Sequence, residues 1–372
     1  MTLKVLHLRD SQWIDGPGRT ILETGAHIDP ERIEFHIAAF VANDTVVHPL
    51  IAGARQRGIR AHSIVDGGGL DPRVVARIVE LVREHSIDVI HTSELRSNLY
   101  GWLARRRCNV KLVRTAHGWI ANDLKRRVMR TVDKLLLSRS DAVIAVSDAT
   151  RALLPWGTRS RALVLRNALM LDRYGADIVN APRPAMTTGA PVVIANVGRL
   201  SPEKGQALLI EAVAQVARHH PALQLLIAGI GPLEAELRQL ANVRGIGDRV
   251  RFLGFVEDMP KVYKDVHLVV QSSFTEGLPN VILEAAYLRV PVVATDVGGT
   301  AEVLGPQGGY LIPPDSLGKL VEGIEAFLAK PARFAQMAGH AHARILEEFA
   351  FDLRTERLMR FYERLCGRNA AA

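Results

Sequence analysis

Two glutamates, Glu276 and Glu284, are separated by seven residues that begin with Gly277-Leu278-Pro279-Asn280. An apolar run typical of a helix starts at Val281, so Glu276 is expected at a loop edge and Glu284 inside the helix. The free backbone N–H groups of such a helix start can bind phosphate or sugar oxygens. An unpaired acid among apolar neighbours is costly to bury, and two vicinal hydroxyls would satisfy Glu284. The alternative, two solvated surface acids, fits these neighbours poorly.

A second candidate site comes after the apolar run Val192–Val197, in Gly198-Arg199-Leu200-Ser201-Pro202-Glu203-Lys204-Gly205. Ser201 is a typical N-cap, Pro202 suits a first helical position, and an acid is favourable in the first turn. Arg199 and Lys204 would then flank a helix N-terminus at the end of a strand. Two cations beside a positive dipole favour an anion such as a diphosphate. The alternative is a capped helix with two solvated cations.

The sequence Gly229-Ile230-Gly231 also comes after a predicted strand, as in dinucleotide-binding loops. The third glycine position is occupied by Glu234, and no acid ends the next strand to hold a ribose, which makes this a weak cofactor signature. A tight turn with close backbone approach is the better prediction. The same departure argues against a nicotinamide-dependent dehydrogenase.

Two features near the start of the chain could also contact a ligand. Gly16 and Gly18, on either side of Pro17, open a predicted helix, and a loop of this kind allows backbone to approach a ligand. A plain turn is an equally good interpretation. His117 comes after a predicted strand, where ligands of parallel sheets bind, although a lone histidine is often only structural.

These residues are positioned by short runs rich in Val, Ile and Leu that alternate with amphipathic stretches, a pattern typical of parallel sheets covered on both faces. Strands are expected at Lys4–Leu8, Phe35–Phe40, Ala61–Val65, Asp88–His91, Lys111–Thr115, Ala142–Val146, Ala162–Leu165, Val192–Val197, Gln224–Ala228, Val250–Leu253, Leu268–Gln271, Pro291–Thr295 and Tyr310–Ile312. The pattern predicts two α/β, Rossmann-like, doubly wound domains over 1–180 and 192–350 that face a central cleft. A Pro-, Thr- and Gly-rich linker is expected over 181–191.

The composition limits the class of protein. The chain has 372 residues and a net charge of +8. Residues 1–170 hold 26 Lys and Arg against 17 Asp and Glu, so the first half is basic and suggests an anionic partner. The two cysteines, Cys108 and Cys366, lie far apart and favour a reducing compartment. No signal peptide or membrane-spanning run is evident, which indicates a cytoplasmic location.

The expected helix over 122–139 carries Arg126, Arg127, Arg130 and Lys134 opposite an apolar face. A solvated face on a core-packed helix is one interpretation. The other is contact with anionic lipid headgroups on the inner face of the cell membrane, helped by the apolar stretch before Arg105-Arg106-Arg107. The basic clusters lack the aromatic spacing of a nucleic-acid module, so no nucleic-acid partner is predicted.

The stretches Val197–Gly205 and Glu276–Glu284 resemble the donor loop and the E-x7-E motif of the retaining glycosyltransferases of family 4, which have the GT-B fold. The resemblance covers nearly the whole chain. It implies that the cations Arg199 and Lys204 hold the diphosphate of a nucleotide sugar, that Glu284 binds the ribose and that Glu276 binds the transferred sugar. The further residues that it implies are backbone from Gly277 to Val281, Phe255-Val256 at the nucleobase, Gly16 and Gly18 at the diphosphate, and His117 near the reacting sugar.

Three features qualify or extend that resemblance. Pro17 separates two glycines that are adjacent in many family members. The family also implies a last helix, here 351–368, that crosses back to the N-terminal domain. Val297-Gly298-Gly299 and Glu302 resemble the residues that family members carry after the E-x7-E motif.

Sequence and resemblance together predict a retaining hexosyltransferase that uses a UDP- or GDP-sugar and a sugar or lipid-linked acceptor, in cell-surface polysaccharide or glycolipid synthesis. No metal or other cofactor is expected, because the cations would take the leaving-group charge. The alternatives are a sugar-nucleotide epimerase, a phosphorylase, for which no pyridoxal lysine is evident, and a catalytically silent GT-B scaffold at the membrane.

Overall fold

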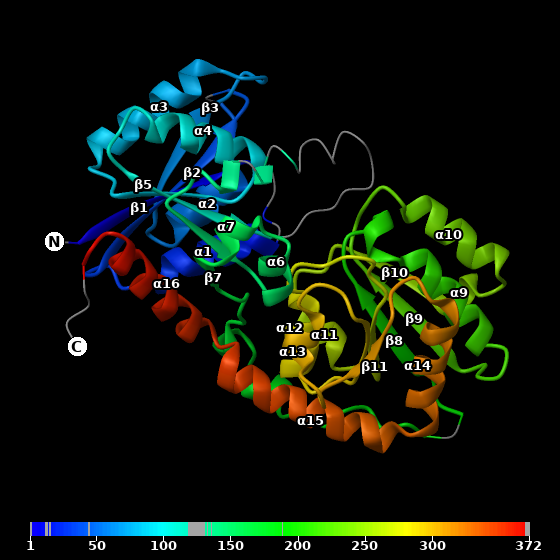
Figure 1. Ribbon diagram of the computed structural model, residues 1–372. Coiled ribbons are helices and arrows are strands. Elements are labelled where there is room, and N and C mark those ends of the chain that lie inside the picture. The colour runs from blue at the N-terminus through cyan, green and yellow to red at the C-terminus, as the bar shows by residue number, and fades with distance from the viewer. Residues whose placement is uncertain are drawn as a thin grey trace. The chain divides into compact units, whose positions relative to one another are not determined.

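The computed structural model describes residues 2–11, 14, 16–43, 45–117, 131, 133–134, 136–187 and 189–368. Most of the helix expected over 122–139 therefore lies outside the described residues. The chain folds into two compact units, one formed by Met1–Asn167 with Asp352–Ala372 and the other by Ala168–Phe351 (Figure 1).

The first unit contains a seven-stranded parallel sheet in the order β3-β2-β1-β4-β5-β6-β7. Its strands are β1 Leu3–Arg9, β2 Ile33–Val41, β3 Arg60–Val65, β4 Val89–Thr92, β5 Lys111–Ala116, β6 Ala142–Ala145 and β7 Ala162–Val164. Its described helices are α1 Gly16–His27, α2 Pro49–Gln56, α3 Pro72–Glu84, α4 Leu95–Arg105, α6 Asp148–Ala152, α7 Trp156–Arg159 and α16 Phe351–Leu365.

Helix α16 belongs to the core of the first unit although it lies at the far end of the sequence (Figure 1). Leu358, Met359 and Tyr362 are buried with strand residues of β1 and β2. At the rim of this contact, Arg32 donates hydrogen bonds to both carboxylate oxygens of Glu363, at 2.9 and 2.8 Å. An amphipathic helix with one apolar face is thus fixed by packing and by a bidentate ion pair.

The second unit contains a six-stranded parallel sheet in the order β10-β9-β8-β11-β12-β13. Its strands are β8 Val192–Val197, β9 Leu223–Ala228, β10 Val250–Gly254, β11 Leu268–Gln271, β12 Val292–Thr295 and β13 Tyr310–Ile312. Its helices are η1 Leu171–Arg173, α8 Ala176–Val179, η2 Pro202–Lys204, α9 Gln206–Val216, α10 Glu234–Val243, η3 Gly247–Arg249, α11 Met259–Tyr263, α12 Asn280–Tyr287, α13 Thr300–Leu304, α14 Leu317–Ala329 and α15 Pro331–Glu348.

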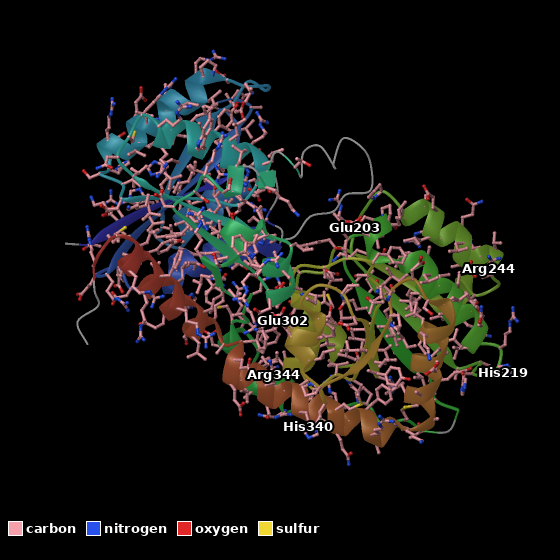
Figure 2. The ribbon with its side chains drawn as sticks, in the orientation of Figure 1. Glu203, His219, Arg244, Glu302, His340 and Arg344 are labelled. Carbon is pink, nitrogen blue, oxygen red and sulfur yellow. The ribbon has the colours of Figure 1, made fainter. Side chains whose placement is uncertain are left out.

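Helices α12, α13 and α15 contribute buried residues to one of the two cores of this sheet. Residues 168–180, which the sequence assigns to the first domain, pack with this core through Tyr174, Ile178 and Val179. The Arg344 guanidinium on α15 donates to the backbone oxygen of Glu302 on α13 at 3.1 Å from Nε (Figure 2). That bond satisfies a carbonyl near the end of a five-residue helix.

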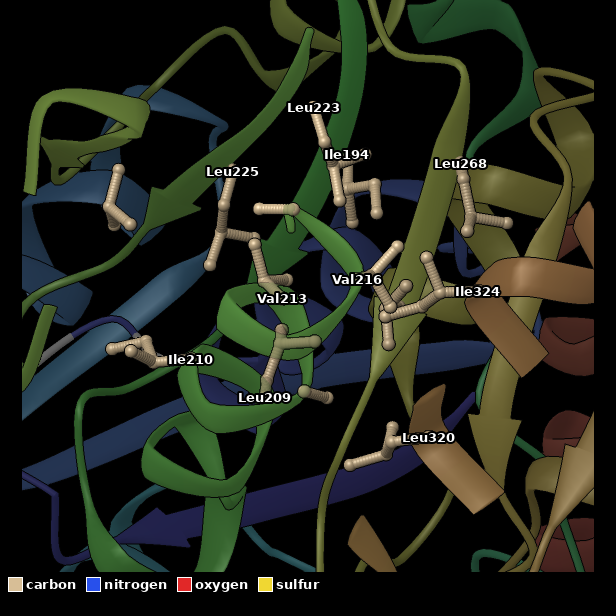
Figure 3. Packing of buried hydrophobic residues seen from close by; sticks show 14 of the residues in the cluster. Ile194, Leu209, Ile210, Val213, Val216, Leu223, Leu225, Leu268, Leu320 and Ile324 are labelled. Carbon is tan, nitrogen blue, oxygen red and sulfur yellow. The ribbon is translucent and has the colours of Figure 1, made fainter. Parts of the chain in front are cut away.

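The other core of the second sheet is formed with α9, α10 and α14. Leu209, Val213 and Val216 of α9 and Leu320 and Ile324 of α14 are all less than 1% exposed. Figure 3 shows them directed toward the strand residues. Because both faces of the sheet are covered, its central strands are apolar on both sides, as β11 and β12 are.

The predicted tandem of parallel, doubly wound α/β sheets is confirmed, and all thirteen expected strands are present. In each sheet the strand order reverses next to the first strand of the unit, between β1 and β4 and between β8 and β11. Ligands of such sheets bind beyond the carboxyl ends of the strands at this switch point. Among the described residues, no helix combines the length and apolar character that crossing a membrane requires.

Candidate active site

The two sequence motifs of the second unit meet at its switch point. The loop after β8 and the loop after β11 are joined by the Ser272 hydroxyl, which donates to the backbone oxygen of Lys204 at 3.0 Å. The amide of Phe274 also donates to the backbone oxygen of Glu203, at 2.8 Å. Residues about seventy positions apart are therefore held together by side-chain and backbone hydrogen bonds.

Ser201 stands at the N-cap position and Pro202 at the first helical position, as expected, but they open a short 3-10 helix and not the long helix that the sequence predicts. Pro202–Lys204 form a 3-10 turn, Gly205 is left-handed with φ 64°, and α9 begins at Gln206. Ser201 caps no backbone N–H and instead donates from its hydroxyl to Glu203 at 2.7 Å. A Cβ at Gly205 would lie 2.1 Å from the backbone oxygen of Ser272, so the approach of the two loops imposes this break.

Gly229 and Gly231 allow close backbone approach, as expected. A Cβ at Gly229 would lie 1.9 Å from the backbone oxygen of Gly198, and one at Gly231 would lie 2.3 Å from that of Leu200. The amide of Leu200 donates to Ile230 at 3.1 Å, which ties this turn to the loop after β8. These glycines shape the loop that carries Arg199 and Lys204.

Lys204 and Glu276 form an ion pair, with Nζ 2.6 Å from Oε1. The Lys204 side chain is 25% exposed and that of Glu276 is 11% exposed. The hydroxyl of Ser273 donates to the same oxygen of Glu276 at 2.7 Å. Lys204 and Glu276 are therefore held next to each other in a partly buried position at the switch point. The cation is suited to bind phosphate, and the acid is suited to bind hydroxyl groups.

The loop that carries Glu276 rests on Gly298, which is left-handed with φ 57°. A Cβ there would lie 2.1 Å from the backbone oxygen of Glu276, and the amide of Gly299 donates to Gly277 at 2.7 Å. The sequence shows that Gly298 and Gly299 come after the E-x7-E motif, but it does not reveal that they support Glu276.

Glu284 lies within α12, as predicted, and its partner was not foreseen. The hydroxyl of Tyr263, a fully buried residue at the end of α11, donates to Oε2 of Glu284 at 3.4 Å. Burial, and next the Glu284 charge, hold the pKa of Tyr263 well above its ordinary value, so the phenol stays a donor. Pro279 stands at the N-cap of α12 and has no side-chain group to cap that end, where Leu278, Asn280 and Val281 also lie.

The other predicted contacts of this unit are exposed to different degrees. Arg199 is exposed, and its backbone oxygen accepts from Gln206 Nε2 at 2.9 Å. Phe255 is 66% exposed, and Val256 is half-buried next to it. An aromatic ring this exposed at the end of β10 is available to a ligand.

In the first unit, the carboxyl ends of β1, β4 and β5 surround a cavity of about 30 Å³, room for ordered water. His7, His91, His117, Arg354 and Tyr362 are among its lining residues. His91 bonds through Nδ1 to the Tyr362 hydroxyl at 2.5 Å and through Nε2 to Thr115 at 2.7 Å. The sequence predicted His117 here and missed the other four.

His117 has a buried Nε2 with no hydrogen-bond partner among the described residues. Burial, followed by the charges of Arg9 and Arg354, lowers the pKa of His117 to about 3. Its ring is therefore neutral near pH 7, and its Nε2 can donate or accept one hydrogen bond, depending on the tautomer. Gly16 and Gly18 lie in the first turn of α1, Gly16 half-buried and Gly18 buried.

Two family models match the chain. The model "Glycosyl transferases group 1" matches residues 185–344, and "Glycosyl transferase 4-like domain" matches residues 15–168. The chain belongs to the group 1 family of glycosyl transferases. Arg199, Lys204, Glu276 and Glu284 lie within the first match, and His117 lies within the second.

Curated proteins that are similar in sequence to this glycosyl transferase are named as glycosyltransferases or mannosyltransferases. The D-inositol 3-phosphate glycosyltransferase of Gordonia bronchialis is 30% identical over 307 residues, which cover 74% of this chain and 66%, just under two thirds, of that relative. The lipopolysaccharide core biosynthesis mannosyltransferase LpsB of Rhizobium meliloti is 28% identical over 286 residues, which cover 71% of this chain and 79% of the relative.

Solved structures share the fold. Anabaena Alr3699/HepE, solved in complex with UDP, superposes with a TM-score of 0.82 at 23% identity, covering 97% of this chain and 100% of that one. Sucrose-phosphate synthase from Thermosynechococcus elongatus gives a TM-score of 0.82 at 21% identity, with 98% and 99% covered. The expected GT-B-like fold is confirmed. The expected enzyme class is also confirmed: the chain is a glycosyltransferase of the retaining family 4, which takes sugars from nucleotide sugars.

Proposed function

We propose that this glycosyl transferase moves a hexose from a UDP- or GDP-sugar, with retention, to a sugar or lipid-linked acceptor in cell-surface polysaccharide or glycolipid assembly. The observation that carries the proposal is the Lys204–Glu276 ion pair, 2.6 Å long, at the switch point of the second sheet. It joins a phosphate-binding group to a hydroxyl-binding group at the place where such sheets bind nucleotides.

The chemistry depends on where charge develops. As the bond from the anomeric carbon to the diphosphate breaks, negative charge grows on the diphosphate oxygens, where Lys204 and Arg199 would stabilise it. The acceptor oxygen attacks the same face, and its proton passes to a diphosphate oxygen of the leaving group. Glu276, already bonded to Lys204 and Ser273, would orient the sugar hydroxyls rather than attack the carbon.

The first unit is the proposed acceptor domain. Gly16 and Gly18 would approach the donor diphosphate, and neutral His117 would hydrogen-bond a sugar hydroxyl. The relatives named for inositol phosphate and lipopolysaccharide core support a phosphorylated or lipid-linked acceptor, as does the basic first half of the chain. We place the chain at the inner face of the cell membrane, without crossing it.

A thermal-shift series tests the donor assignment. UDP, GDP and their hexose derivatives are each added to the full chain, and the matching nucleotide should raise Tm, because a ligand at 100 times its Kd adds about 2.7 kcal/mol of stability. The sugar nucleotide that shifts Tm is then incubated with and without saccharide and lipid-linked acceptors. Conversion of the donor without an acceptor would favour an epimerase, and binding without turnover would favour a silent scaffold.

Glu284→Ala is expected to raise the Kd of the matching nucleoside diphosphate roughly ten- to a hundredfold, since hydrogen bonds to a charged group contribute about 1.5–3 kcal/mol. Titration calorimetry with the free nucleotide measures this separately from catalysis. Glu325→Ala, at an exposed position of α14, is the matched control and should leave Kd unchanged. Equal affinities of wild type and Glu284→Ala would remove Glu284 from the ribose site.

A further inference from the structure

Three histidines converge on the face of the first sheet that α3 covers. His36 lies on β2 and His62 on β3, and the parallel register pairs Ala38 with His62. Because side chains two residues apart share a face of a strand, His36 and His62 lie diagonally next to each other. His85 comes directly after α3, as its C-cap residue.

The three rings are close and regularly arranged. His36 and His62 stack with their centroids 5.3 Å apart, and His85 lies 5.0 Å from His36 and 4.9 Å from His62. One ring nitrogen from each histidine lies within 4.8 Å of the others, and Nδ1 of His36 is 3.1 Å from Nε2 of His62. When three nitrogens bind one tetrahedral zinc ion at about 2.0–2.1 Å, the distances between the nitrogens are close to the 3.1 Å that separates His36 Nδ1 from His62 Nε2.

Glu34 completes a feature that recurs at metal centres. Its Oε1 is 3.0 Å from Nε2 of His36, the ring nitrogen opposite the one that faces His62. A histidine that binds a metal commonly donates its other N–H to a carboxylate, which fixes the ring and makes the bound nitrogen more basic. The orientation of His36, the most buried of the three, is thus the one that a ligand histidine needs.

We propose that His36, His62 and His85 bind one divalent transition-metal ion of the zinc class, with Glu34 as the outer carboxylate. Imidazole nitrogens suit zinc, and three of them leave a fourth position for water or another ligand. The site lies toward the amino ends of the strands, because a helix between parallel strands ends there and His85 comes directly after α3. The ion would therefore stabilise the first unit rather than take part in sugar transfer.

The cations near this cluster are each paired with an acidic side chain. Arg60 and Lys4 approach Glu34 at 2.9 and 3.6 Å, and Arg77, which lies near His62, approaches Glu80 at 3.0 Å. These acids reduce the repulsion between the cations and a bound divalent ion.

The test uses the full chain without a polyhistidine tag, stripped with chelator and titrated with Co²⁺ and Zn²⁺. We expect one equivalent to bind, the visible absorption of four-coordinate Co²⁺ to appear, and Zn²⁺ to raise Tm. His62→Asn and His85→Asn, at half-buried positions, should each weaken binding more than about tenfold, and Glu34→Gln should weaken it about ten- to a hundredfold.

The matched control is His219→Asn/His220→Asn, which removes two exposed histidines of the second unit (His219 is labelled in Figure 2). It should bind Co²⁺ like the wild type. His36→Asn is a less clean test because this side chain is fully buried and its loss can unfold the strand. Absence of stoichiometric binding, or binding that survives His62→Asn and His85→Asn, would reduce the cluster to stacked, hydrogen-bonded histidines. Neither outcome bears on the transfer site.

Discussion

Lys204→Ala is expected to lower kcat for sugar transfer about 100- to 1,000-fold while the protein remains folded. This is the loss measured when one donor to a developing negative charge is removed from an active site. Lys204 is the expected source of positive charge at the diphosphate, and Gly205 and Ser272 hold its backbone in place. Initial-rate kinetics with saturating donor measure kcat, and circular dichroism reports the fold.

The control for Lys204 is a lysine in an ion pair of similar length elsewhere in the unit. Lys319 pairs with Glu322 at 2.7 Å, but both side chains are about half exposed on α14. Lys319→Ala should leave kcat unchanged, because an exposed pair contributes little even to stability. A Lys204→Ala enzyme with kcat within tenfold of wild type would contradict the proposed role.

The double variant Lys204→Ala/Glu276→Gln distinguishes a joint site from two separate contacts. Because the two side chains touch, their effects on kcat should be strongly non-additive, with the double variant close to the worse single one. Strict additivity of the two free-energy changes would mean that the ion pair is incidental to the reaction.

Most of the fold is predictable because it depends on local patterns. The strands are short Val-, Ile- and Leu-rich runs, and burial on both faces requires that composition. The helices α12 and α14 are predictable by the same reasoning within a few residues at each end. The short helices α7, α8, α11 and α13 were missed, because four or five residues carry too little periodicity to be recognised.

Candidate site residues stand out in the sequence where the chemistry is local and not where it depends on packing. Arg199, Lys204, Glu276 and Glu284 stand out by residue type and spacing. Tyr263 does not, because its contact with Glu284 requires α11 and α12 to be side by side. The break at Gly205 was missed for a similar reason, since the local sequence from Ser201 favours a helix and only the approach of Ser272 opposes it.

The histidine cluster was not recognised in the sequence, because recognising it requires the register of two strands. His36 and His62 occupy the same face once the register of two parallel strands is known, but register across a crossover helix is not encoded in either strand. His91 and Tyr362 are a harder case, since their 2.5 Å contact joins β4 to a helix at the other end of the chain.

Gly298→Ala is expected to lower kcat/KM at least about a hundredfold, because misplacing a catalytic group by about 1 Å costs that much. Two effects combine at this position. The left-handed φ of 57° disfavours alanine, and its Cβ would lie 2.1 Å from the backbone oxygen of Glu276, so the loop must move. Lys204 then loses its partner at the switch point, and the transferred sugar loses its proposed contact.

Gly245→Ala separates those two effects. Gly245 is also left-handed, with φ 72°, but a Cβ there would meet no atom within 4 Å. It should cost about 1–2 kcal/mol in the free energy of unfolding through backbone strain alone and leave kcat/KM unchanged. Denaturant titration and steady-state kinetics on both variants give the comparison. If Gly298→Ala lost stability like Gly245→Ala but kept its activity, the Glu276 loop would tolerate displacement. The acid would then not be positioning the sugar.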